Sequence, residues 1–233
     1  MSKYTTVIYN ANLITMDDEN KVIDNGYLVF VDGLIHALGT GAPEMDEYTD
    51  SIDANGGLVT PGLINCHTHA PMSLFRGLGD DEPDRLKRFI FPLEAKYVSP
   101  EFVRTGTALS CVEMLLGGTT CFADMYFFEE EVAATASELG IRVLAGQTLM
   151  NGATPDAATI EDAFTRAVNF CEDWNSDDLV TPCLAPHAPY SLDTKQLKHV
   201  KNVANDLGVK IQMHVAESQF EIQHLQKINQ PSS

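Results

Sequence analysis

The sequence predicts an α/β protein, namely a partial (β/α)8 TIM-type barrel of about five βα units, preceded by a small β-rich segment. From Leu58 onward, strand-like apolar runs alternate with helix-like stretches, a pattern that specifies parallel pairing through right-handed crossovers. Before Leu58, short apolar segments are separated by turn signals and no helix-like stretch intervenes. A doubly wound open sheet is the alternative architecture. In either fold the carboxyl ends of the strands are where catalytic groups lie.

The N-terminal segment is expected to be all β. Asp32-Gly33 separates two of its strand-like runs and is a strong hairpin signal. His36 is interpreted as a strand residue on a solvated face. The predicted strands are 6–9, 13–16, 27–31 and 34–38.

The remainder of the chain predicts alternating strands and helices. Pro100 in a first turn and Gly117-Gly118 at the far end delimit the longest helix. The predicted strands are 63–68, 119–123, 142–146, 179–185 and 210–215. The predicted helices are a stretch around 84–91, then 100–116, 130–139, 160–174 and 194–207, and a last helix from near Ser218.

Composition excludes several classes of protein. Fifteen basic against 33 acidic side chains give a net charge of −18, which repels nucleic acids and anionic membranes. No apolar run reaches the roughly 18 residues of a membrane span, and no secretory signal is recognisable, so we expect a cytoplasmic protein. Five cysteines without a Cys-x-x-Cys pair argue against a disulfide framework and a cysteine zinc ribbon.

Two histidines lie at the end of the first predicted barrel strand. Side chains two apart on a strand point the same way, so His67 and His69 project together and form half of a metal site. His214, at the end of the fifth predicted strand, is a third imidazole that can reach the same space. The alternative is that these are ordinary core or surface histidines, because His-x-His is a common tripeptide.

Residues 58–69, LVTPGLINCHTH, closely resemble the first-strand signature of the amidohydrolase superfamily. Residues 70–77, APMSLFRG, resemble the branch that holds deaminases of S-adenosylhomocysteine and 5'-methylthioadenosine, related aminohydrolases and chlorohydrolases. The resemblance extends from about Tyr4 to about Leu225. It implies that residues 1–58 form the N-terminal β segment of a composite sandwich, 59–226 an incomplete metal-dependent hydrolase barrel and 227–233 a polar tail.

The resemblance also implies roles for individual residues. His67, His69 and His214 would hold one Zn²⁺ per chain, with Fe²⁺ as the alternative ion for these ligands. Glu217 would be the catalytic proton shuttle that also contacts the substrate; the alternative is a solvated glutamate in a helix first turn. His187, in the loop 185–190, would contact the substrate beside the metal. No lysine occurs between residues 179 and 190, which indicates the single-metal branch.

Glu94 is a weaker candidate for a substrate contact, by resemblance to a segment that grips ribose hydroxyls; a helix-surface charge is the alternative. His199 and His224 are interpreted as surface residues. The implied reaction is hydrolytic deamination of a purine nucleoside-like or related aminated heterocycle, a small-molecule substrate. The loop 147–155 has no arginine, which weakens a thioadenosine or homocysteine assignment. Chlorohydrolase or cyclic amidase activity is the alternative within the family.

The length of the chain predicts an incomplete barrel. A complete (β/α)8 barrel alone takes about 250 residues, and the family's remaining aspartate ligand and a further histidine follow later strands. We therefore expect the N-terminal half of an enzyme. The alternative to an active enzyme is that the chain is a catalytically incomplete scaffold. Unpaired strand edges would favour self-association.

Overall fold

The computed structural model describes residues 4–43, 48–82 and 85–228, which divide into two compact units at the peptide between Gly62 and Leu63. The sequence predicted the boundary between the β segment and the barrel after residue 58. The difference arises because β5 (Leu58–Val59) pairs with β1 and so belongs to the first unit.

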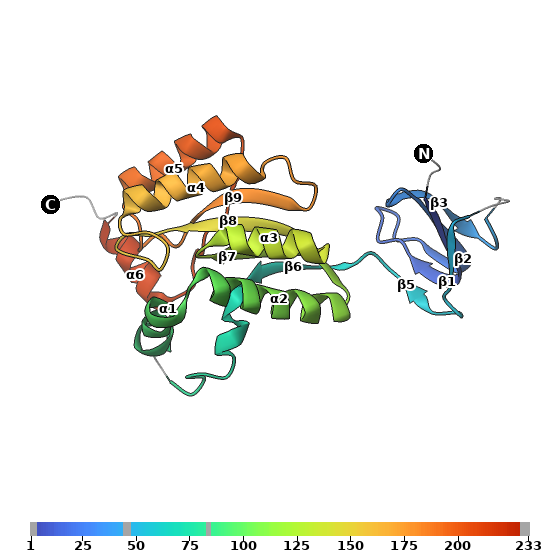
Figure 1. Ribbon diagram of the computed structural model, residues 1–233, viewed down its shortest axis with the longest axis horizontal. Helices are drawn as coiled ribbons and strands as arrows, with labels where there is room; N and C mark the ends of the chain where they lie inside the picture. Colours follow the sequence, from blue (N-terminus) through green and yellow to red (C-terminus); the bar gives the residue numbers. More distant parts are fainter. Residues whose placement is uncertain (1–3, 44–47, 83–84, 229–233) are drawn as a thin grey trace. The chain divides into compact units, whose positions relative to one another are not determined.

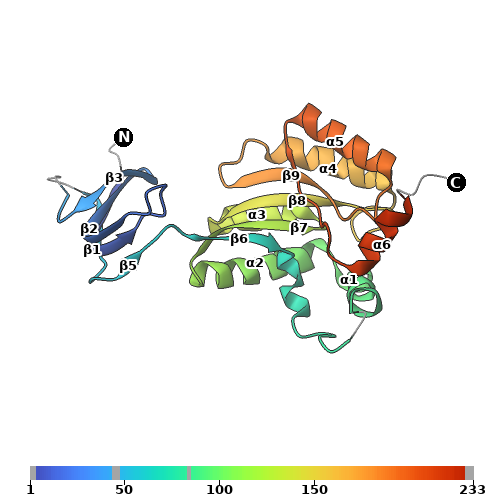
Figure 2. The same cartoon turned by 180° about the vertical axis from the view of Figure 1, so that it is seen from behind.

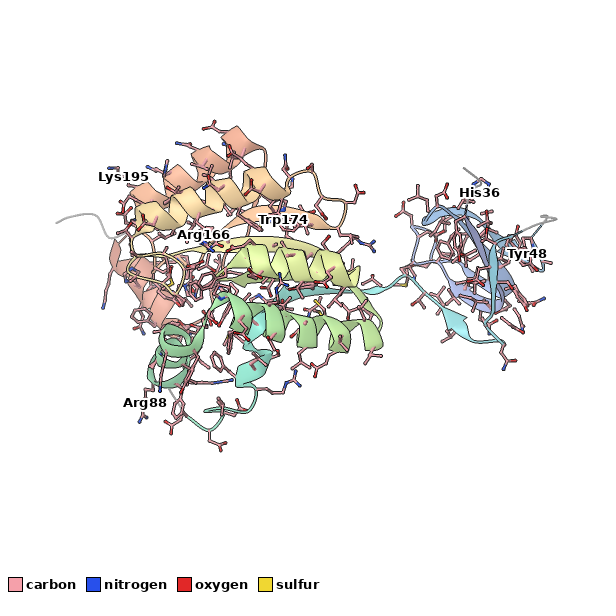
Figure 3. All side chains as sticks on the ribbon, viewed as in Figure 1. His36, Tyr48, Arg88, Arg166, Trp174 and Lys195 are labelled. Atoms are coloured by element: carbon pink, nitrogen blue, oxygen red, sulfur yellow. The ribbon has the colours of Figure 1, made fainter. Side chains whose placement is uncertain are left out.

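The first unit is a five-stranded sheet of β1 (Thr5–Ile14), β2 (Val22–Val31), β3 (Leu34–Thr40), β4 (Asp50–Asp53) and β5, in the order β3-β2-β1-β4 with β5 also on β1. The predicted runs 6–9 and 13–16 fall on one strand, β1, which ends at Ile14 and has register irregularities between Ile8 and Ala11 and between Ala11 and Leu13. The predicted hairpin is confirmed. Asp32 and Gly33 both take positive φ, 50° and 80°, as a two-residue hairpin turn requires. His36 is exposed on β3, as expected (Figure 3).

The second unit is built on a parallel sheet of β6 (Leu63–Thr68), β7 (Thr119–Tyr126), β8 (Arg142–Leu149), β9 (Val180–Pro186) and β10 (Lys210–Ile211). The strands lie in the order β10-β9-β8-β7-β6, so neighbours in the sequence are neighbours in the sheet. A doubly wound sheet would reverse its strand order at a switch point. The unbroken order therefore shows the wall of a partial barrel, as predicted.

Four helices line the sheet: α2 (Pro100–Leu116), α3 (Glu129–Leu139), α4 (Ile160–Trp174) and α5 (Thr194–Leu207). Each packs against the next one along the wall, as Figures 1 and 2 show from opposite sides. Side chains that cap the first turn explain why three of these helices start where the sequence predicts, whereas α3 starts one residue early, at Glu129, and has no side-chain cap. Ser99 caps α2, and Thr159 and Asp193 form capping boxes at α4 and α5.

Shorter helical elements lie outside the wall. η1 (Ala70–Phe75) is a 3-10 helix directly after His69, and a π-helical turn, Leu86–Ile90, leads into α1 (Phe91–Tyr97). The stretch predicted around 84–91 is thus helical from Arg85, whereas residue 84 lies outside the described residues. The last helix, α6, spans Gln219–Ile228.

The fifth predicted barrel strand is shorter than expected. The sequence predicted a strand over 210–215, but β10 ends at Ile211. Beyond Ile211 the backbone leaves the ladder, and it turns at Ala216, which takes a left-handed φ of 60°. His214 consequently lies in a loop after the strand.

None of the helices formed by the described residues has both the length and the apolar character needed to cross a bilayer. The cytoplasmic location stays a prediction.

Candidate metal centre

Three predicted histidines meet at the carboxyl end of the parallel sheet. His67 and His69 come from the end of β6, and His214 follows β10. Their ligating nitrogen atoms lie within 4.8 Å of one another, and each pair of rings has a centroid separation of 5.1 Å. Because β6 and β10 are the two outer strands of this sheet, only its curvature can bring these residues together.

Backbone carbonyls orient two of the three imidazoles. His69 Nδ1 lies 2.6 Å from the carbonyl oxygen of Met125, and His214 Nδ1 lies 2.9 Å from that of His187. A carbonyl oxygen only accepts, so each Nδ1 carries the proton and each Nε2 keeps its lone pair. Burial lowers the pKa of His69, which favours the neutral ring. Three imidazoles whose ring nitrogen atoms converge in this way fit a zinc ion.

Glu217 lies on the loop after His214 and is exposed. Its negative charge acts on both His69 and Tyr190, in the direction that raises the pKa of each, so the carboxylate is close to the histidine cluster. Glu217 precedes α6, which starts at Gln219, so it does not lie within the first turn of that helix.

Glu221 fixes the loop that carries Glu217. Its fully buried carboxylate accepts the backbone N–H of Ala216 at 2.8 Å and that of Glu217 at 3.0 Å, while its own N–H donates to the Ser218 hydroxyl at 3.3 Å. Sequence reasoning missed this residue. The Ser-x-x-Glu spacing of a capping box was the signal that could have found it.

His187 extends from the end of β9 toward the same cluster. Its ring centroid is 5.1 Å from that of His214 and 5.9 Å from that of Tyr190. Burial, and then the neighbouring His214 and His69, lower the pKa of His187 to about 4, so the ring is neutral at physiological pH. Its buried Nδ1 has no hydrogen-bond partner among the described residues.

A cavity of about 370 Å³ opens beside the cluster, lined by His69 and His187 together with Glu94. Glu94 is only 8% exposed, so the surface-charge alternative is wrong. Burial raises the pKa of this carboxyl to about 7, and interaction with the Tyr126 hydroxyl opposes part of the rise. Most of the remaining lining is apolar: Met72, Leu86, Ile90, Phe91, Met125, Phe127 and Met150.

A fully buried aspartate, which the sequence analysis missed, lies behind the first two histidines. Asp124 Oδ1 accepts hydrogen bonds from the Thr68 hydroxyl and, at 2.6 Å, from the Ala70 backbone N–H. Burial raises the pKa of Asp124 to about 6. The available signal was a carboxylate within the apolar run of β7. His199 on α5 and His224 on α6 are not part of the cluster.

Comparison with known proteins agrees with this geometry. Residues 58–230 match the model of the amidohydrolase family. A 5-methylthioadenosine/S-adenosylhomocysteine deaminase of Thermodesulfovibrio yellowstonii is 41% identical over 231 residues, 97% of this chain and 53% of that protein. A 5'-deoxyadenosine deaminase of Methanopyrus kandleri is 37% identical over 92% of this chain and 50% of that protein. The chain thus spans about half the length of the curated relatives it matches.

Solved structures show the same relationship. An adenosine deaminase from Xanthomonas campestris with bound zinc superposes with a TM-score of 0.86 at 31% identity, over 94% of this chain and 51% of that one. A guanine deaminase from C. acetobutylicum, with a TM-score of 0.83 at 20% identity over 97% of this chain and 57% of that one, shares the fold. The chain therefore belongs to the amidohydrolase family.

Proposed function

We propose that this protein is a zinc-dependent aminohydrolase that removes an amino group from a purine nucleoside-like or related heterocycle and releases ammonia. The observation that carries the proposal is the convergence of His67, His69 and His214 with the Nε2 atoms of His69 and His214 free to bind a metal ion. The deaminases among its relatives, and the zinc in the similar adenosine deaminase structure, support the same choice of reaction and ion.

The reaction exchanges the bond between a ring carbon and its amino group for a bond between that carbon and oxygen. Bound zinc supplies the positive charge that makes a water molecule acidic near neutral pH. Held by His67, His69 and His214, the ion would supply this chemistry, and Glu217 would take a proton from the attacking water and deliver it to the ring nitrogen beside the carbon to which the water oxygen bonds. The proton of the newly bound hydroxyl would pass to the amino group, which would leave as ammonia as the C=O bond forms, so one water is consumed for each ammonia released. His187, neutral and with a free ring nitrogen, hydrogen-bonds the reacting edge of the substrate.

The cavity supports a proposal for how the substrate is held. Its apolar side chains suit the faces of a flat heterocycle, while Glu94 offers a carboxyl group in the same cavity. We assign Glu94 to the hydroxyl groups of a sugar or a similar polar substituent. Glu94, Glu217 and His187 are the proposed substrate contacts.

The test is ammonia release by the zinc-loaded chain with adenosine, methylthioadenosine, S-adenosylhomocysteine, guanine and chloro-triazines. The Thermodesulfovibrio yellowstonii relative serves as the positive control. Turnover of an aminated purine is the expected result. Chloride release from a triazine without ammonia release from any purine would replace deamination by chlorohydrolysis. No turnover of any compound, with the control active, would support a catalytically incomplete scaffold.

The Glu217→Gln variant tests the proton shuttle. It keeps the size of the side chain and removes its basic oxygen, so ammonia release should be lost while zinc content stays at the wild-type value. A rate within about tenfold of wild type, about 1.4 kcal/mol of barrier, would show that Glu217 does not have this role.

We also propose that the chain self-associates through the edges of its parallel sheet. Among the described residues, the outer edges of β6 and β10 have no strand partner. Leu63 and Ile64 on β6 are 62% and 68% exposed. Unpaired apolar edges of this kind favour pairing between chains. Light scattering over a range of concentrations should show oligomers, whereas a monomer at every concentration would contradict the proposal.

A further inference from the structure

A hydrogen-bonded path joins the two segments that carry the three histidines. On one side, the Asp124 carboxylate accepts hydrogen bonds from Thr68 and Ala70, the residues that flank His69. On the other side, the Asp124 backbone carbonyl accepts a hydrogen bond from the Gln212 side-chain amide. Gln212 lies two residues before His214. A single residue of β7 therefore contacts both segments.

The Gln212 side chain crosses two strands to make this contact. β7 and β10 are separated in the sheet by β8 and β9, so the amide must pass over the face of those strands. Small residues leave room for it. A Cβ added at Gly146 of β8 would lie 2.0 Å from Gln212 Nε2 and 2.9 Å from the Cβ of Ala185 on β9. A side chain at position 146 would thus displace the amide.

The other hydrogen bonds that fix His214 all lead toward β9, including that of its own ring Nδ1 to the His187 carbonyl oxygen. β10 has only two residues, and beyond it the backbone N–H of Gln212 donates to Leu184 at 3.1 Å and that of His214 to His187, also at 3.1 Å. Both of these bonds hold the segment to β9 and to the loop that follows it. The hydrogen bond from the Gln212 side-chain amide to Asp124 connects the segment that carries His214 to β7, the neighbour of β6.

Asp124 is suited to hold a fixed position because it is fully buried. A buried carboxylate has no water to exchange with its protein donors, so its hydrogen bonds are strong and hold one orientation. The two donors on Oδ1 come from both sides of His69, which limits rotation of the segment that carries the first two histidines.

The geometry points to Gln212 and Asp124 as positioning residues that set the separation between the His67–His69 pair and His214. This inference rests on the metal centre of the proposed function and extends it to residues that touch neither the ion nor the substrate. The same hydrogen bonds would also exist in a purely structural barrel core. A positioning role and a purely structural role differ in one measurable quantity, the affinity for zinc. Only the positioning role predicts that this affinity falls in a variant whose stability is unchanged.

The experiment measures the zinc dissociation constant of the purified chain by competition with a chromophoric chelator. Gln212→Leu removes the amide at similar volume, and Thr68→Val removes the hydroxyl that donates to Asp124. Gln223→Leu on α6 and Thr105→Val on α2 make the same changes at exposed positions. Loss of an interaction that orients metal ligands typically weakens metal binding about 10- to 100-fold. We expect that loss in the first two variants and less than about twofold change in the controls.

The double variant Gln212→Leu/Thr68→Val adds a second criterion. Because both changes act through Asp124, the combined loss should be smaller than the product of the two single losses. Urea unfolding of the zinc-free proteins shows which variants keep wild-type stability. Cobalt substitution then reports the ligand geometry through its visible absorption spectrum.

Zinc affinity within about twofold of wild type in a folded Gln212→Leu variant would overturn the inference. Should that variant not fold, Thr68→Val decides in the same way. A wild-type chain that binds no zinc would overturn the inference together with the metal centre. Ammonia release plays no part in this test, so a chain whose zinc affinity depends on Gln212 but which deaminates nothing would disprove only the proposed reaction.

Discussion

The buried carboxyl of Glu94 gives a prediction whose size follows from the structure. Burial raises its pKa from 4.5 to about 7, and each pKa unit corresponds to about 1.4 kcal/mol. Between these two values the native state binds the proton and the unfolded state does not. The free energy of unfolding therefore falls as pH rises through this window, by up to about 3 kcal/mol in total.

The Glu94→Gln variant isolates this contribution. Glutamine resembles the protonated carboxyl and does not titrate, so the variant lacks this part of the pH dependence. The difference in unfolding free energy between variant and wild type should grow in favour of the variant by about 2 to 3 kcal/mol between pH 5 and pH 8. Other buried acids, such as Asp124, titrate in both proteins and cancel in the difference.

The assay is urea unfolding followed by tryptophan fluorescence. Trp174 is the only tryptophan of the sequence and lies on α4, in the same unit as Glu94, so the signal reports the relevant unit (Figure 3). Glu138→Gln, an exposed change on α3, is the matched control. A stability difference for Glu94→Gln that stays the same at both pH values, within about 0.5 kcal/mol, would refute the reasoning that Glu94 is held in a desolvating cavity.

Three further predictions follow from individual contacts. In Gly106→Ala, the new Cβ would lie 2.4 Å from the Pro71 carbonyl oxygen, so urea unfolding should show a loss of about 1 to 3 kcal/mol; unchanged stability would contradict this close packing. Glu221→Ala leaves the backbone N–H of Glu217 without its acceptor and should cost about 1 to 3 kcal/mol by the same measurement, whereas a neutral result would mean that water replaces the carboxylate. Zinc at 100 times its dissociation constant should stabilise the wild-type chain by about 2.7 kcal/mol, seen as a raised melting temperature, and His214→Ala should abolish that rise.

The elements that the sequence determined are those set by residues close to one another in the chain. The helices 100–116, 160–174 and 194–207 were predicted with the bounds that the structure has, because their capping residues and terminal signals lie within the segments themselves. The same holds for the strand Leu63–Thr68, which delivers His67 and His69 to one site.

Other features depend on partners that are distant in the sequence, and only the tertiary structure decided them. Periodicity could not show that β10 ends at Ile211, since the paired length of a strand depends on its neighbour. Glu94 could be read as a surface charge until the cavity around it was known. The hydrogen bonds of Asp124 join it to Thr68 across 56 residues and to Gln212 across 88. Burial and hydrogen bonding of this kind arise when the sheet curls, and no local pattern of residues encodes them.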